Sequence, residues 1–122
     1  MTLGETFLNT NPYIAVHLWA IVSTPTVEHA VVMFNFTSWK SGCDETCLIK
    51  TGEHPFVQHD TVVAYRRGQL LSRAAWNELQ RLGFYQEHAA LSDSLLRRIQ
   101  QGALDSEFTP IDLQDIIRAC MS

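Results

Sequence analysis

The chain has 122 residues, 46% of them hydrophobic and 18% charged, so it can bury a core as one domain without a disulfide or metal staple. Its formal net charge of −4 argues against broad attraction to nucleic acid, because a phosphate-binding surface usually appears as a basic excess. The few cysteines favour a reducing cytoplasm over an oxidising compartment, and no apolar run reaches the roughly 18 residues that a membrane span requires.

The first part of the chain predicts strands. Residues 13–23 are rich in β-branched and aromatic residues and end before Pro25, which cannot donate a hydrogen bond to a sheet. Residues 28–37 alternate, with Phe34 and Phe36 on the face that is expected to meet the core. The other expected strands are a short extended piece at 5–8, residues 46–50, residues 61–65 and an apolar piece at 69–71.

The second part of the chain predicts helices. Apolar residues recur at helical spacing over residues 72–83, and the serine at the first of these positions is a suitable N-cap. A second helix is expected over about 92–101, with Gly102 at its end. A third helix is expected to begin with Thr109 as the N-cap and Pro110 at the first helical position.

This order of strands first and helices second indicates an α+β domain with an antiparallel sheet, because the strand and helix alternation of a parallel sheet is missing. Several short strands joined by turns predict a small antiparallel β-barrel over residues 13–71. The helices of residues 72–122 are expected to pack on that barrel. Residues 1–122 are therefore predicted to form a single domain.

Two of the expected strands resemble a known family. Residues 17–23 (HLWAIVS) and 31–38 (VVMFNFTS) are similar to strands of the PemK/MazF-like toxins, the growth inhibitors of toxin–antitoxin systems, of which the chain looks like a divergent member. The resemblance implies an SH3-like barrel that cleaves single-stranded RNA as an endoribonuclease, without a metal or other cofactor. It also implies a homodimer and an antitoxin-like protein partner.

The resemblance further implies a catalytic pair, an arginine at the start of the early strand and a Thr or Ser at the end of the next. Thr37 or Ser38 matches the second position, whereas the first position holds His17. An imidazole can act as acid or base near neutral pH, but it lacks the permanent bidentate charge of arginine. This departure keeps an alternative function open, a non-catalytic SH3-like binding module that engages a protein partner.

Residues 54–65 (HPFVQHDTVVAY) hold the densest polar cluster of the chain. His54 and His59 could provide the base and the acid of metal-independent RNA cleavage, and Arg66 or Arg67 could stabilise the phosphoryl charge. The alternative is structural, because both histidines could instead bond the backbone of their loop. Both interpretations stay open at this point.

Substrate binding is expected beside the catalytic set. The arginines suit an RNA phosphate, and an adjacent tyrosine could stack on a base, although a solvated surface is the alternative for the arginines. The candidate substrate-binding residues are Asn35, Ser38, Tyr65, Arg66 and Arg67.

The same region suggests two further chemistries beside the expectation of no metal. Cys43, Cys47, His54 and His59 bring four zinc-type ligands into a short segment, although the paired turns of zinc-binding folds are missing. Cys47 with His54 could also form a nucleophilic pair, without a recognisable oxyanion-hole motif.

Overall fold

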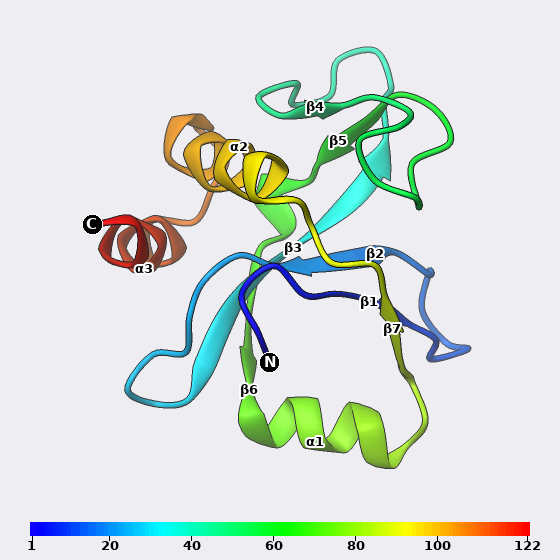
Figure 1. The fold of residues 1–122 in the computed structure, drawn as a ribbon, viewed down its shortest axis with the longest axis vertical. Helices are drawn as coiled ribbons and strands as arrows, with labels where there is room; N and C mark the ends of the chain where they lie inside the picture. Colours follow the sequence, from blue (N-terminus) through cyan, green and yellow to red (C-terminus); the bar gives the residue numbers. More distant parts are fainter.

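The computed structural model describes residues 1–122 and shows an α+β protein with an open antiparallel sheet of 7 strands and three α-helices (Figure 1). In chain order the elements are β1 (Thr6–Asn9), β2 (Leu18–Ile21), β3 (Ala30–Ser38), β4 (Leu48–Ile49), β5 (Thr61–Val63), the 3₁₀-helix η1 (Tyr65–Arg67), β6 (Gln69–Ser72), α1 (Arg73–Arg81), β7 (Tyr85–His88), α2 (Asp93–Asp105) and α3 (Ile111–Met121). No helix is both long enough and apolar enough to cross a membrane.

Strand β3 organises the sheet, because it is the longest strand and pairs along both of its edges. On one edge it pairs with β2, from which the strand order continues through β1 to β7. On its other edge, its first half pairs with β6 and its last residues pair with β5, which carries β4. No pairing joins β4 to β7, so the structure shows an open sheet where the sequence predicts a closed barrel.

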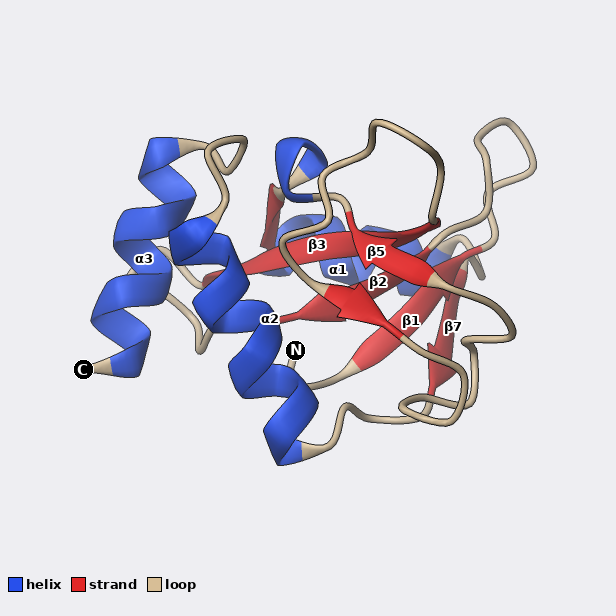
Figure 2. Cartoon of the chain, turned by 90° about the horizontal axis from the view of Figure 1, so that it is seen from above, coloured by secondary structure: helices blue, strands red, loops and turns tan.

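The two faces of β3 meet two different hydrophobic clusters. Phe34 and Phe36 lie in the larger cluster, which α2 and α3 cover side by side (Figure 2). Val31 and Met33 lie in the smaller cluster, against which Trp76 of α1 is partly buried. The sequence predicts the first of these buried faces. The second face is buried because α1 follows β6 directly and folds against that side of the sheet.

Serine side chains cap the first two helices. The Ser72 hydroxyl accepts a hydrogen bond from the Ala75 N–H at 3.1 Å, and the Ser92 hydroxyl accepts one from the Leu95 N–H at 3.2 Å. Each bond satisfies one backbone donor that the first helical turn leaves unpaired. The predicted starts of both helices are thus confirmed.

Two other predicted helix boundaries are wrong. Helix α2 continues past Gly102 to residue 105. Gly102 does not end the helix in a left-handed turn; it leaves room for the Tyr65 side chain, which packs against it inside the core. Helix α3 has Pro110 at its N-cap instead of the predicted Thr109. The first correction concerns a residue whose role depends on tertiary packing, and the second shifts the helix start by one residue.

Strand β7 was not predicted. Its middle residues, Gln86 and Glu87, are exposed, so the strand shows no alternation of apolar and polar residues. It is held by antiparallel pairing with β1, in which Tyr85 lies opposite Asn9. The part of the chain that follows residue 72 therefore contributes a strand to the sheet as well as three helices.

Candidate functional site

An open cavity of about 420 Å³ lies at the end of β3, between the segment that enters β2 and the loop that leads into β5. It brings together His17, Thr37 and His59 of the predicted catalytic set, and Ser38 of the predicted substrate-binding set. The lining residues are Val16, His17, Phe36, Thr37, Ser38, Phe56, Gln58, His59 and Thr61. We call this cavity the histidine cavity.

The pairing of β2 with β3 explains why His17 reaches this cavity. Trp19 lies opposite Asn35 in the antiparallel register. Continuing that register by two residues on each strand brings His17 opposite Thr37, on the same face of the sheet. The sequence separates these two residues widely, but the strand pairing makes them neighbours.

His59 enters the cavity from the loop before β5. Its Nε2 atom lies 2.7 Å from the Ser38 Oγ atom, and the imidazole tautomer decides which of the two donates the hydrogen bond. Both residues are exposed, so the pair is accessible to a substrate. The next residue, Asp60, pairs instead with Lys50 at 3.2 Å.

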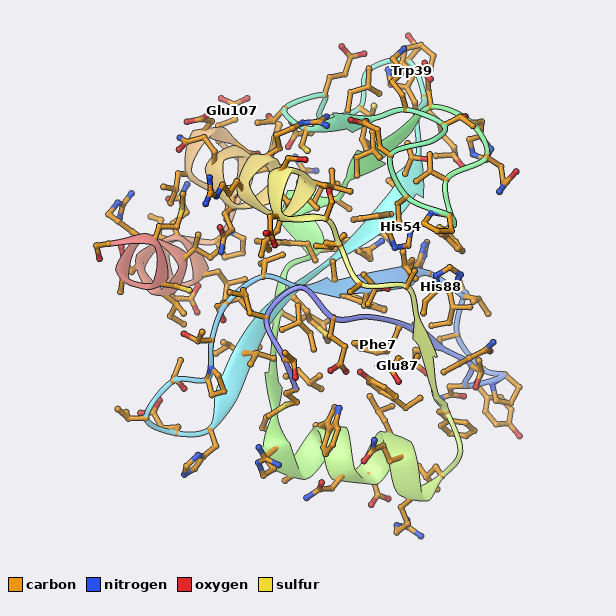
Figure 3. All side chains as sticks on the ribbon, viewed as in Figure 1. Phe7, Trp39, His54, Glu87, His88 and Glu107 are labelled. Atoms are coloured by element: carbon orange, nitrogen blue, oxygen red, sulfur yellow. The ribbon has the colours of Figure 1, made fainter.

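His54 lies outside the histidine cavity and is buried, which corrects its assignment to the catalytic set. Its Nε2 atom donates to the Ala89 carbonyl at 2.7 Å, and its Nδ1 atom accepts from the Phe56 N–H at 3.1 Å. Burial lowers the pKa of His54, which therefore favours the neutral imidazole. Figure 3 shows the ring next to His88, at a centroid distance of 5.4 Å. His54 thus ties its loop to the segment after β7. Only its bond with the Phe56 N–H lies within the loop itself, where the structural interpretation places such bonds.

A second cavity of about 260 Å³ holds the predicted arginines. Arg66 and Arg67 are exposed on η1 and line it, and Phe108 lines it from the connection between α2 and α3. The Arg66 guanidinium lies over the Phe108 ring, 4.4 Å from its centroid. We call this cavity the arginine cavity.

Asp44 also lines the arginine cavity. Partial burial acts to raise its pKa, but hydrogen bonds from Ser106 and Thr46 and the charge of Arg66 outweigh burial and hold the pKa below its ordinary value. The carboxylate accepts from the Ser106 hydroxyl at 2.6 Å and from the Thr46 N–H at 3.0 Å. Asp44 is therefore a fixed anion at physiological pH.

The structure buries the side chains of Tyr65 and Asn35. Tyr65 borders the arginine cavity, but the residue is 0% exposed, so its ring is not open for stacking on a base. The Tyr65 hydroxyl donates to the Ile99 carbonyl at 2.8 Å, and its ring is fully buried against Phe34. Burial raises the pKa of Tyr65 far above its ordinary value, so the hydroxyl stays protonated. Asn35 is 1% exposed and donates weakly to the Phe36 carbonyl at 3.4 Å. Both assignments to substrate binding are corrected.

The predicted zinc ligands do not come together. Cys43 lines the arginine cavity, Cys47 is buried in the larger cluster, and the two histidines lie apart as described above. No group of three or more His, Cys, Asp or Glu side chains has an arrangement that could hold a metal ion. Burial raises the pKa of the Cys47 thiol, which also disfavours the thiolate that a nucleophilic pair needs.

Sequence reasoning missed several residues of the two cavities. Phe56, Gln58 and Thr61 belong to the segment that the polar cluster singles out, so finer inspection of that segment could have found them. Phe108 gives no signal of its own, because it precedes the third helix in a stretch without a motif. It reaches the arginine cavity only through the packing of α2 and α3.

The chain was compared with protein-family models, curated proteins and solved structures, and none of them matches it.

Proposed function

We propose that the protein is a PemK/MazF-like toxin-type endoribonuclease that cleaves single-stranded RNA in the histidine cavity without a metal ion. One observation carries this proposal: His17, Thr37, Ser38 and His59 all line the same open cavity. Two imidazoles and two hydroxyls provide the proton acceptor, the proton donor and the hydrogen-bond donors that RNA cleavage needs.

The proposed reaction uses the RNA as its own nucleophile. One imidazole removes the proton from a ribose 2′-hydroxyl, whose oxygen attacks the adjacent phosphorus. The other imidazole protonates the departing 5′-oxygen, which leaves a 2′,3′-cyclic phosphate and a 5′-hydroxyl end. The hydroxyls of Thr37 and Ser38 donate hydrogen bonds to the phosphoryl oxygens as negative charge builds up.

This proposal predicts that His17→Ala and His59→Ala each slow RNA cleavage by about 100-fold or more, because general acid–base groups typically contribute factors of that size. The measurement is cleavage of a labelled, mixed-sequence single-stranded RNA in the presence of EDTA. His29→Asn is the matched control, since His29 is exposed in a turn far from the cavity and asparagine tolerates its positive φ of 61°. Cleavage that persists unchanged in both cavity variants would exclude the histidine mechanism.

The SH3-like assignment of the sheet is part of the same proposal. Support comes from β3, which is shared between two groups of strands, with β2 on one edge and β5 and β6 on the other. A long strand shared in this way lets a short antiparallel sheet curl around one core. The larger hydrophobic cluster, which contains residues of β2, β3, β4 and β5 together with residues of α2 and α3, supports this assignment.

A second candidate function is the non-catalytic module that binds an antitoxin-like protein or another partner. No arginine or lysine lines the histidine cavity, so it offers no fixed positive charge to a phosphorane-like transition state. The loop at its entrance exposes Tyr13, Ile14 and Val16, and clustered exposed apolar residues often mark protein interfaces.

Co-expression with the product of the adjacent gene separates the two functions. A binding module predicts a stable complex that Tyr13→Ser with Ile14→Ser disrupts, together with an isolated chain that leaves RNA intact. Protein-dependent RNA cleavage by the purified chain, lost in His59→Ala, would contradict the non-catalytic function.

A further inference from the structure

The arginine cavity lies directly beside the histidine cavity. Thr37 is the one residue that lines both, so the two cavities adjoin at the end of β3. The cross-strand pair of Thr37 with Val62 forms the boundary, since Val62 lines the arginine cavity and its neighbour Thr61 lines the histidine cavity. Because the two cavities share Thr37, one extended ligand can contact both.

The arginine cavity holds two positive charges and one negative charge, because Asp44 lines it beside Arg66 and Arg67. Neither Arg66 nor Arg67 takes part in an ion pair. Four other cations each pair with a carboxylate, namely Lys50, Arg81, Arg98 and Arg118, and the remaining three do not. Two unpaired guanidinium groups in one cavity stand out in a chain whose formal net charge is −4. They are suited to a ligand that brings its own negative charge, such as a phosphate.

The cavity also offers a flat surface for an aromatic ring. Arg66 lies over Phe108, and Phe108 is 37% exposed, so the stacked pair is open to solvent. Nucleic-acid bases stack on aromatic rings and on guanidinium planes with little regard to sequence. The ionised Asp44 repels a phosphate but can accept hydrogen bonds from base amino groups, which orients a nucleotide with its base inward.

We infer that the arginine cavity binds the nucleotide next to the scissile one on the same single-stranded RNA, with its base on the Arg66–Phe108 pair and its phosphate at Arg67. The inference rests on the proposed function, because it takes the histidine cavity as the place of cleavage. It adds a binding subsite built partly from Phe108, outside the polar segment that the sequence singles out.

The test is the binding of a fluorescein-labelled, random-sequence 2′-O-methyl octaribonucleotide, which cannot be cleaved because its attacking hydroxyls are blocked. Arg66→Ala and Phe108→Ala should each weaken binding in fluorescence anisotropy by about tenfold, the size expected for one lost stacking contact. Arg66→Lys should weaken it similarly, since the charge remains but the planar platform is lost. Arg67→Ala should lower the slope of log affinity against log salt by about 0.7, the value for one phosphate contact.

Arg73→Ala is the matched control, because Arg73 lies over Trp76 at 5.7 Å from the ring centroid and lines neither cavity. It removes the same charge from a similar stacked pair and should bind the octamer as the wild type does. Thermal unfolding of each variant verifies that the fold is retained.

The outcomes separate the subsite from the proposed function. Weaker octamer binding by Arg66→Ala and Phe108→Ala, in a protein that leaves unmodified RNA intact, would support the subsite and reject cleavage. The inference is overturned if these variants bind like Arg73→Ala, or if the wild-type protein does not bind the octamer at all. Both of these outcomes leave the proposed function open to its own test. RNA cleavage by the wild-type protein that His59→Ala abolishes would still support it.

Discussion

Gly102 shows how one absent side chain fixes the position of a helix. A Cβ atom there would overlap the Tyr65 hydroxyl and lie 2.9 Å from the ring carbon that carries it. Overpacking of a core lowers stability by about 1–3 kcal/mol. In a helix, alanine is about 1 kcal/mol more favourable than glycine, which offsets part of that cost. The difference leaves a net cost of up to about 2 kcal/mol, so we expect Gly102→Ala to lower the free energy of unfolding by up to about that amount in urea denaturation. The upper end applies because the added Cβ meets both the hydroxyl oxygen and the ring carbon of Tyr65.

A double-mutant cycle with Tyr65→Phe is the control for that prediction. Tyr65→Phe alone removes the hydrogen bond to the Ile99 carbonyl and should cost about 1 kcal/mol. Combined with Gly102→Ala, it removes the overlapping oxygen. The double mutant should therefore lose less stability than the sum of the losses of the two single mutants. Strict additivity would show that the contact between the two residues does not limit the helix position.

At the scale of elements, His54 couples the loop of residues 51–60 to the segment between β7 and α2. The pKa of His54 is lower in the folded protein than in the unfolded chain, where a histidine takes up a proton below about pH 6.5. Below that pH the unfolded chain therefore binds more protons than the folded protein does. Stability should therefore fall as the pH drops from 7.5 to 5.5, by at most about 1.4 kcal/mol per pH unit for one proton. The cause is burial first, with the nearby His88 acting in the same direction.

Urea unfolding at pH 7.5, 6.5 and 5.5 measures this effect. His54→Gln cannot take up a proton in this range, so its stability should depend less on pH than that of the wild type. His29→Asn, which removes an exposed histidine instead of the buried one, is the matched control. An equal pH dependence in the wild type and His54→Gln would assign the effect to other groups.

The elements also show what the sequence could and could not predict. The alternation in β3 and the serine caps of α1 and α2 are local signals, and the structure confirms them. Strand β7 has no local signal, because it is a polar strand held by its pairing with β1. The end of α2 was misplaced because Gly102 contacts Tyr65, a residue distant in sequence.

For the whole molecule, the prediction of an α+β fold with an antiparallel sheet is confirmed, whereas the sheet is open. The candidate site could be predicted in part, since His17, Thr37, Ser38 and His59 were selected by residue type and resemblance and share one cavity. The burial of His54, Tyr65 and Asn35 could not be predicted, because it depends on how the helices cover the larger cluster and how α1 covers the other face.

The most direct test of RNA cleavage in the histidine cavity is the chemical nature of the RNA ends. Purified protein is incubated with single-stranded RNA in EDTA, and the products are analysed by mass spectrometry. Attack by the 2′-hydroxyl predicts 2′,3′-cyclic phosphate and 5′-hydroxyl ends, which His17→Ala and His59→Ala should fail to produce. Intact RNA, or fragments with 3′-hydroxyl and 5′-phosphate ends, would contradict the account.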